Sequence, residues 1–224
     1  MMSESSAGAI RPPAAPLVIG VGGCSGSGKT SIAKELARLL AGTHFPLDHY
    51  YRDLSHLPPD ERSQQDFDDP EMLESDLLAE HVGQLAKGRA IDRPLYDFST
   101  HGRVPGKTEK IEPGEALVVD GIFALHYHGL LPLYDLAVYV DTPDDICFAR
   151  RLARDVRERG RTPESVKAQY DATVRPMAEK YVTPSARNAG LVLDGTNSPE
   201  RLLDQVLAEL RRRDLLTQPR TLRN

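Results

Sequence analysis

Short apolar runs alternate along this chain with longer segments whose apolar residues recur at helical spacing. The run Leu17–Val21 is rich in β-branched residues and bounded by glycine, which is typical of a buried parallel strand. It is followed by Lys29–Ala41, where apolar residues recur every three or four positions until Gly42 ends the predicted helix. Further apolar runs predict strands at Phe45–Leu47, Leu117–Val119, Leu136–Val140 and, more weakly, Leu191–Leu193.

Four more helices are predicted from a shared start signal, a capping side chain followed by proline. The capping oxygen accepts a backbone N–H that the first turn leaves unpaired, and proline has no such N–H. The signals are Asp69-Pro70, Thr142-Pro143, Thr162-Pro163 and Ser198-Pro199, which predict helices at about 71–87, 143–158, 163–181 and 199–213. This alternation predicts an α/β fold, a doubly wound parallel sheet with helices on both faces.

A length of 224 residues fits one large domain that buries its own core. Residues 1–16 are small, polar and rich in proline, so we expect a disordered tail before a single domain at 17–213 and a second tail at 214–224. The segment Arg89–Pro113 lacks a helical period and is rich in Gly, Pro and charged residues. A segment this long without an obvious element indicates a functional insertion.

Composition excludes several classes of protein. The net charge of −5 argues against a generally basic nucleic-acid-binding protein. Two cysteines, Cys24 and Cys147, are too few for a disulfide framework or a zinc site, and favour a reduced compartment such as the cytoplasm. The apolar runs are far shorter than the roughly 20 residues of a bilayer span. The N-terminal segment also lacks the apolar region of a secretory signal.

The segment between the first strand and the first helix matches the phosphate-binding P-loop pattern in full, from Gly23 to Thr30. Glycines let several backbone N–H groups point at one anion, and the helix N-terminus adds partial positive charge. Lys29 would reach the β- and γ-phosphates, and the Thr30 hydroxyl would be an oxygen ligand for Mg²⁺. A chance Gly/Ser turn is the alternative, which the flanking strand and helix disfavour. The predicted nucleotide-binding residues are Gly23, Ser25, Gly26, Ser27, Gly28, Lys29 and Thr30.

Two acids follow predicted strands, at the sheet edge where ligands of doubly wound proteins bind. Asp120 ends the run Leu117–Val119 in the Walker B manner and would hold Mg²⁺ directly or through water. Its alternative is an ordinary turn residue in an Asp-Gly pair. Asp48 follows Phe45–Leu47 and could take a proton from an attacking hydroxyl.

The segment 150–161 holds six arginines against two acids. The planar guanidinium group binds phosphate in a bidentate manner and stabilises charge on a transferring phosphoryl group. Gly160, shortly before the cap at Thr162, indicates a hinge between two helices, the layout of a lid that closes over a nucleotide. The alternatives are a solvated basic helix face and a nucleic-acid contact, and the acidic composition weakens the second.

The order of the motifs resembles that of the uridine kinase (uridine–cytidine kinase) family of P-loop kinases. The resemblance covers nearly everything from about Leu17 to Leu193, through the P-loop and the segments 48–51, 67–70, 96–103, 120–122 and 151–161. It implies transfer of the γ-phosphate of ATP, or sometimes GTP, to the 5′-hydroxyl of uridine or cytidine, with Mg²⁺. It also implies a β-hairpin insertion over the nucleoside, an Arg-rich lid at about 150–162, and a cytoplasmic homo-oligomer, commonly a tetramer.

The resemblance implies a role for each matched residue. Asp48 would be the base that takes the 5′-hydroxyl proton, and Asp68 would bind the ribose hydroxyls. Tyr96 and His101 would lie at the base, with His101 at the O4 or N4 edge of the pyrimidine. The matched residues of the lid region are Arg154 and Arg159 toward the ATP phosphates, and Arg151, Arg161 and Gln169 toward the nucleoside.

Two positions depart from the family pattern. Asp120 stands where the family usually has Glu, which leaves open whether Mg²⁺ is bound directly or through water, and His49 stands where Ser is usual. Alternative functions are another small-molecule P-loop kinase, such as a phosphoribulokinase-like enzyme, or a non-kinase P-loop ATPase. The segment 96–101 favours a pyrimidine over a sugar phosphate, and Asp48 favours a kinase. The other histidines are predicted to be structural (His44, His56 and His81) or to lie at the surface or an interface (His126 and His128).

Overall fold

The computed structural model describes residues 15–62, 64–98 and 100–216. The predicted N-terminal tail therefore lies outside the described residues except at positions 15 and 16, and the predicted C-terminal tail is described only at 214–216.

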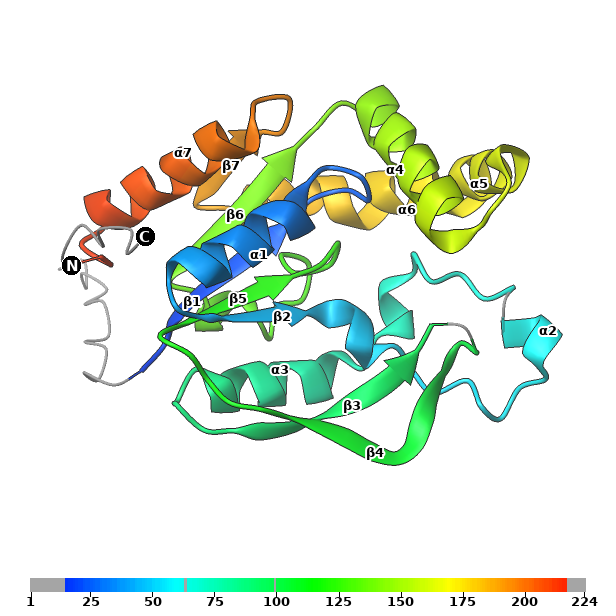
Figure 1. The fold of residues 1–224 in the computed structure, drawn as a ribbon, viewed down its shortest axis with the longest axis horizontal. Helices are drawn as coiled ribbons and strands as arrows, with labels where there is room; N and C mark the ends of the chain where they lie inside the picture. Colours follow the sequence, from blue (N-terminus) through cyan, green and yellow to red (C-terminus); the bar gives the residue numbers. More distant parts are fainter. Residues whose placement is uncertain (1–14, 63, 99, 217–224) are drawn as a thin grey trace, which may run out of the picture.

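Five parallel strands form the central sheet in the order β2-β5-β1-β6-β7 (Figure 1). This confirms the predicted doubly wound sheet, and each predicted strand is present within two residues of its expected ends. The central strand β1 lies between β5 and β6, so the loop that follows β1 is at the switch point where such sheets bind ligands. The strands are β1 (Leu17–Gly22), β2 (Thr43–Pro46), β5 (Ala116–Asp120), β6 (Leu136–Asp141) and β7 (Leu191–Asp194).

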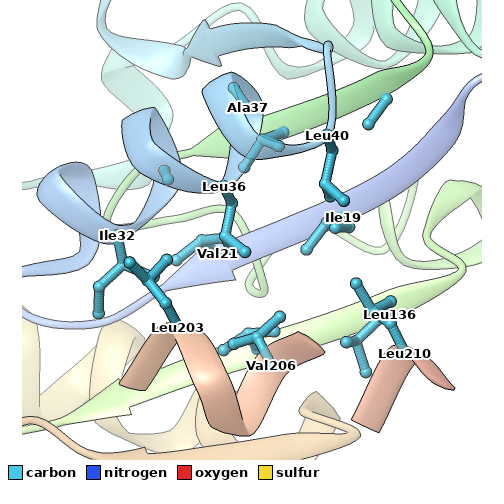
Figure 2. Packing of buried hydrophobic residues seen from close by; sticks show 14 of the residues in the cluster. Ile19, Val21, Ile32, Leu36, Ala37, Leu40, Leu136, Leu203, Val206 and Leu210 are labelled. Carbon is cyan, nitrogen blue, oxygen red and sulfur yellow. The ribbon is translucent and has the colours of Figure 1, made fainter. Parts of the chain in front are cut away.

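Alternate residues of the same strands are buried on opposite faces of this sheet. Ile19 and Val21 pack against α1 (Lys29–Leu39) and α7 (Pro199–Arg212), as Figure 2 shows, whereas Val18 packs on the other face, which α3 (Ser75–Leu85) covers. A strand buried on both faces reads as a continuous apolar run, which explains the sequence pattern. Each such side chain contributes about 1.5–3 kcal/mol on full burial.

The predicted insertion is a β-hairpin that forms a sheet of its own. Strands β3 (Ile91–Asp97) and β4 (Gly102–Ile111) pair antiparallel, with a register shift between Pro94 and Tyr96. Proline lacks the N–H that a regular ladder needs, so an irregularity there is expected. The hairpin runs along α3 on the lower side of the molecule in Figure 1. A single-turn helix, α2 (Pro59–Arg62), lies between β2 and α3.

Two helices stand at the carboxyl end of the sheet, the end to which the arrowheads of β5 and β6 point in Figure 1. These are α4 (Asp144–Arg159) and α5 (Pro163–Gln169). Gly160 separates them with a φ of 63°, a left-handed conformation that suits glycine. The predicted break between two helices is therefore present, and its role as a hinge stays a prediction.

The start signals at Thr162 and Ser198 are confirmed, because each side chain accepts a backbone N–H of the first turn of α5 or α7. The prediction at Asp69 is wrong in extent. Its carboxylate caps only a short 3-10 turn, Pro70–Met72, and the helix proper begins later at Ser75. The chain between them is extended because Leu73 pairs with Tyr51 in an antiparallel bridge.

Two further helix predictions need correction. Thr142 does not cap α4, because its hydroxyl donates to the Ser27 carbonyl and Pro143 takes the capping position. The single helix predicted at 163–181 is a broken series after α5. Pro176 and Pro184 lack the N–H groups that a regular helix needs, and the chain changes its hydrogen-bond period around them. The series consists of a π-helical segment (Tyr170–Val174), α6 (Arg175–Met177), a second π-helical segment (Ala178–Val182) and a 3-10 segment (Thr183–Asn188).

Candidate active site

The P-loop curls between β1 and α1 through three glycines with positive φ, at Gly23, Gly26 and Gly28. At Gly26 a Cβ would lie 2.2 Å from the carbonyl oxygen of Cys147, so any side chain would collide with the start of α4. Gly28 is the residue before α1 and has a φ of 97°. Glycine is therefore required by both the close approach and the backbone conformation.

The carbonyl of Ser27 holds the P-loop to two other elements. It accepts a hydrogen bond from the Thr142 hydroxyl at 3.1 Å and one from the Arg150 guanidinium at 3.2 Å. Arg150 also donates to the carbonyl of Gly195, in the loop after β7. The Ser27 hydroxyl is buried and has no hydrogen-bond partner among the described residues. The loop is thus fixed in shape by contacts that sequence reasoning did not identify.

The two residues predicted to meet the nucleotide from α1 differ in exposure. Lys29 is only 9% exposed, and its Nζ donates to the Cys24 carbonyl at 3.4 Å, so its side chain arches back over the loop. Thr30, the next residue, is exposed to solvent. Its hydroxyl is therefore accessible to a ligand.

Asp120 is the last residue of β5 and is buried. Its Oδ2 lies 3.2 Å from Nε2 of His44, while its Oδ1 is buried without a hydrogen-bond partner among the described residues. An orphaned buried carboxylate oxygen, with the accessible Thr30 hydroxyl on α1, fits a hard cation such as Mg²⁺. In the described part of the chain no group of three or more His, Cys, Asp or Glu side chains could hold a metal.

Asp48 lies one residue beyond the end of the predicted strand, in a 3-10 turn (Leu47–Tyr50) after β2. Its side chain is accessible to solvent yet enclosed by surrounding protein groups. This enclosure and the negative charge of Asp120 raise the pKa of its carboxyl, while the positive charges of Lys29, Arg159 and Arg154 lower it. The structure therefore brings Asp48 together with the residues predicted for the phosphate side.

A small pocket lies beside the P-loop, and the predicted ribose-binding residue Asp68 is in its wall. Asp68 is buried, which raises the pKa of its carboxyl, while the positive charge of Arg151 lowers it. The remaining wall joins the P-loop, the residues after β5 and the broken helix, through Ser25, Ile122, Val174, Ala178 and Val182.

Aromatic rings connect this region to the hairpin. Tyr51 lies 5.3 Å from Phe67 and 5.6 Å from Tyr96, measured between ring centroids. The Tyr96 hydroxyl is buried without a hydrogen-bond partner among the described residues, and burial raises the pKa of this phenol to about 12. His101 stacks on Phe67 at 4.8 Å, with an angle of 26° between the rings. The phenol and imidazole predicted to contact the base therefore belong to one aromatic cluster, formed by Tyr51, Phe67, Tyr96, Phe98 and His101.

Phe67 is a functional candidate that sequence reasoning missed, although it stands directly before Asp68. Its ring supports His101, whose backbone is left-handed (φ 50°) in the hairpin turn. Burial lowers the pKa of the His101 imidazole below its usual value, so the ring is neutral at pH 7. The hairpin residue Ser99 lies outside the described residues.

Three residues predicted for the nucleoside side form a hydrogen-bonded group. The Arg151 guanidinium donates to the Ser25 hydroxyl at 2.9 Å and to Oε1 of Gln169 at 3.0 Å. Arg161 donates to the same Gln169 oxygen at 2.6 Å. Arg151 is buried, and its burial lowers the pKa of the guanidinium, while the charges of Asp68 and Asp155 raise it. The lid and the P-loop are thus in direct contact through Arg151 and Ser25.

Arg154 and Arg159, predicted for the ATP phosphates, both lie against Asp155. Arg154 donates to this carboxylate at 2.9 Å, and a nitrogen of Arg159 lies 3.4 Å from the same oxygen. Asp155 is completely buried. The sequence offered only its place among the arginines as a signal, and no role was predicted for it.

The other histidines contribute little to this site, with one exception. His81 hydrogen-bonds to the Tyr50 hydroxyl at 2.8 Å, which fits its predicted structural role. His126 and His128 lie in the turns that follow β5. The exception is His44, predicted to be structural, which contacts Asp120.

Comparison with known proteins identifies the family. The chain matches the model of the phosphoribulokinase/uridine kinase family over residues 18–200. The chain belongs to this family. It is 42% identical over 198 residues to a uridine kinase of Chloroflexus aggregans, covering 87% of this chain and 94% of the relative. It is 40% identical over 199 residues to a uridine kinase of Geobacillus kaustophilus, covering 88% and 94%.

The fold is similar to that of other kinases. The D-glycerate 3-kinase of Cryptococcus neoformans superposes with a TM-score of 0.55 at 18% identity, over 75% of this chain and 79% of that chain. The predicted P-loop kinase fold and the resemblance to uridine kinases are both confirmed. Within the described ranges, no helix combines the length and apolar character that a membrane span needs.

Proposed function

We propose that the protein is a nucleoside kinase that transfers the γ-phosphate of ATP to the 5′-hydroxyl of uridine and cytidine, giving UMP and CMP for pyrimidine salvage. The observation that carries this proposal is the position of Asp48. The positive charges of Lys29, Arg159 and Arg154 act on this carboxylate, and its own negative charge acts on Asp68. A base between phosphate-binding cations and a sugar-binding acid suits transfer to a sugar hydroxyl.

The phosphate side neutralises the charge of the triphosphate. The backbone N–H groups from Gly23 to Thr30 and the N-terminus of α1 bind the β- and γ-phosphates, with Lys29 as the cation beside them. Arg154 and Arg159 stabilise the negative charge on the transferring phosphoryl group. Thr30 and Asp120 are the residues that would hold Mg²⁺, which supplies further charge neutralisation at the phosphates when bound.

Asp48 supplies the proton acceptor. The proton of the 5′-hydroxyl passes to the Asp48 carboxylate, while the hydroxyl oxygen forms the new bond to the γ-phosphorus. The bond from this phosphorus to the β–γ bridging oxygen breaks, and ADP leaves with that electron pair. Its raised pKa makes the Asp48 carboxylate a stronger base than an ordinary aspartate.

The nucleoside side holds the sugar and the base. Asp68 accepts hydrogen bonds from the two ribose hydroxyls, in a group with Arg151, Arg161 and Gln169. Tyr96 and His101 lie at the base, and the buried Tyr96 hydroxyl has an unmet hydrogen bond to offer. A neutral imidazole has one donor and one acceptor nitrogen, so His101 can pair with O4 of uracil or N4 of cytosine.

Uridine and cytidine are therefore both expected as substrates. Purine nucleosides are expected to be poor, because a second ring would have to displace the packed rings of Tyr51, Phe67 and Tyr96. A phosphoribulokinase-like activity is not favoured, because a sugar phosphate has no base that could contact these aromatic rings. The uridine kinase relatives at about 40% identity argue the same way.

The test is a screen of ATP consumption by the purified protein with uridine, cytidine, adenosine and ribulose 5-phosphate. We expect turnover with the two pyrimidine nucleosides and little with the others. Lys29→Ala is the inactive control, because it removes the P-loop cation without disturbing the packed core. Preference for adenosine or ribulose 5-phosphate, or full turnover by Lys29→Ala, would overturn the proposal.

The domain bounds, the phosphate donor and the oligomeric state belong to the same proposal. The kinase domain spans 17–213, with the hairpin insertion at about 89–113 and the lid at about 150–162. ATP is the phosphate donor, with GTP as an alternative. By family resemblance the enzyme is a cytoplasmic homo-oligomer, commonly a tetramer, without a nucleic-acid or membrane partner.

A further inference from the structure

Asp155 is a completely buried carboxylate in the lid that takes no part in the proposed phosphoryl transfer, yet four arginines surround it. Its Oδ1 receives Arg154 at 2.8–2.9 Å and Arg159 at 3.4 Å. Its Oδ2 faces Arg151 at 3.7 Å and Arg161 at 3.5 Å. Each oxygen therefore holds one pair of arginines.

The two pairs differ in the substrate that they serve. Under the proposed function, the Oδ1 pair meets the ATP phosphates and the Oδ2 pair meets the nucleoside. The Oδ2 pair is tied to the nucleoside side by the hydrogen bonds to Ser25 and Gln169. The carboxylate thus stands between the two substrate sites.

The same carboxylate spans the hinge of the lid. Arg151, Arg154 and Arg159 are on α4 with Asp155, whereas Arg161 follows Gly160 and leads into α5. The backbone N–H of Arg161 also donates to the Asp155 carbonyl at 3.2 Å. A change in the partners of one Asp155 oxygen can therefore affect both α4 and the segment that leads into α5.

We propose that Asp155 is a positioning residue that couples the two substrate sites, so that a bound triphosphate raises the affinity for the nucleoside and the nucleoside raises the affinity for the triphosphate. This inference rests on the proposed function. When phosphates draw Arg154 and Arg159 away from Oδ1, the single negative charge is left to Arg151 and Arg161. These two guanidiniums are then held more firmly in the nucleoside site.

The coupling has a definite sign and size. Four guanidinium charges share one carboxylate, so removal of the carboxylate leaves four mutually repelling cations and no partner that is common to both pairs. Linkage requires the two affinities to change by the same factor, and coupling between sites is typically about 5- to 150-fold. We expect a factor of at least about fivefold in the unmodified enzyme.

Titration calorimetry tests this on the full chain. The dissociation constant of uridine is measured with and without the β,γ-imido analogue of ATP and Mg²⁺, and the ratio is the coupling factor. Asp155→Asn should lower this ratio to about one, because a neutral amide cannot redistribute charge between the two pairs. If Asp155 had only a structural role, Asp155→Asn would raise the dissociation constant of uridine equally with and without the analogue, and their ratio would not change.

Glu158→Gln is the matched control. It removes the same charge from the same helix three residues later, but its carboxylate pairs with Arg157, outside the site. The charges of Arg154 and Arg159 also act on Glu158, so the variant controls for general electrostatics. It should keep the coupling factor of the unmodified enzyme. An Asp155→Asn enzyme that keeps this factor, or an equal loss in Glu158→Gln, would overturn the proposal.

The unmodified enzyme decides the matter even if Asp155→Asn does not fold. Uridine affinity is then compared in the presence of the triphosphate analogue and of adenosine, which lacks phosphates. A rise with the analogue alone supports coupling through the arginines. No rise, or an equal rise with adenosine, overturns it. Absence of uridine binding under every condition would instead overturn the proposed function, and the coupling with it.

Discussion

The proposed phosphate side and the proposed nucleoside side of the site differ in how their polar groups are hydrogen-bonded before a ligand binds. On the phosphate side the cations already have protein partners, since Lys29 donates to the Cys24 carbonyl and the lid arginines share Asp155. On the nucleoside side, the ring of His49 lies 6.1 Å from that of Phe98 in the aromatic cluster. Its Nδ1 and the Tyr96 hydroxyl are buried without hydrogen-bond partners in the described part of the chain. Phosphates must therefore exchange partners with these cations, whereas the base meets unmet hydrogen-bonding groups. The group of Arg151, Arg161 and Gln169 on the nucleoside side already has partners within the protein.

This difference separates the expected kinetic effects of substitution. Groups that exchange partners during the reaction should act mainly on kcat, because their new contacts form with the developing charge. Buried groups that wait for a partner should act mainly on KM, because an unpaired buried polar group costs about 1–3 kcal/mol. Asp48→Asn and His101→Ala test this division, and two further predictions concern Mg²⁺ dependence and stability.

The largest effect is expected from Asp48→Asn, on the phosphate side. The amide cannot accept the 5′-hydroxyl proton, and loss of a general base typically lowers the rate by about 10²- to 10⁴-fold. Steady-state kinetics should show this loss in kcat with a small change in the KM for uridine. Binding of Mg²⁺-ATP, measured by calorimetry, should be retained. An Asp48→Asn enzyme with near-normal kcat would remove the base from the mechanism.

The next effect is expected from His101→Ala, on the nucleoside side. Loss of the hydrogen-bond partner of the base should raise the KM for uridine and for cytidine by about 5- to 150-fold, the equivalent of 1–3 kcal/mol. The KM for ATP should change little. His56→Ala is a control, because this histidine is exposed in a turn. Unchanged KM values for both pyrimidines would show that His101 does not contact the base.

A smaller effect is expected at the junction between the two sides, where Asp120 retains one unpaired oxygen. Asp120→Asn should raise the Mg²⁺ concentration needed for half-maximal rate by about tenfold, and His44→Asn should change it in the same direction by less. Mg²⁺ titrations at saturating ATP measure both. Equal Mg²⁺ dependence in all three proteins would argue against a metal role for Asp120.

The smallest effect concerns stability on the nucleoside side. Burial and the positive charge of Arg93 lower the pKa of His49 to about 4. Below pH 6.5 the unfolded ring takes up a proton while the folded ring stays neutral to about pH 4, so His49 makes the fold less stable as the pH falls through this range. The slope is at most about 1.4 kcal/mol per pH unit, reduced by partial exposure of the ring.

His49→Gln should therefore flatten the pH dependence of the unfolding free energy. Urea denaturation at pH 7 and pH 5 gives the loss for each protein, and the variant should lose less than the unmodified enzyme. His56→Gln should behave as the unmodified enzyme. A loss in His49→Gln as large as that in the unmodified protein would mean that this ring titrates normally.

The sequence predicted best what neighbouring residues determine. The P-loop follows from glycines at fixed spacing between a strand and a helix, and the caps at Thr162 and Ser198 act within their own first turns. Short apolar runs likewise located all five strands of the central sheet. The P-loop and the caps depend on contacts within a few positions. Each buried strand is marked by its own apolar run, although its partners in the sheet lie far away in the chain.

The sequence predicted poorly what distant residues determine. Thr142 does not cap α4 because its hydroxyl donates to the carbonyl of Ser27, which lies 115 positions away in the chain. His44 contacts Asp120 across 76 positions, so its partner could not be read from its neighbours. The role of Asp155 was missed because the sequence analysis counted the charges of this segment and did not ask which arginines a single acid would contact. Its role as a shared partner depends on which side chains the helix and the hinge bring together.

The most direct measurement follows the phosphate itself. The purified protein is incubated with ATP labelled in the γ-phosphate and with either uridine or 5′-deoxyuridine, and the labelled products are separated. We expect label in UMP, attached at the 5′ oxygen, and no transfer to 5′-deoxyuridine, which keeps the base and both ribose hydroxyls. Absence of label in UMP, or label on 5′-deoxyuridine, would contradict the assignment of the reaction.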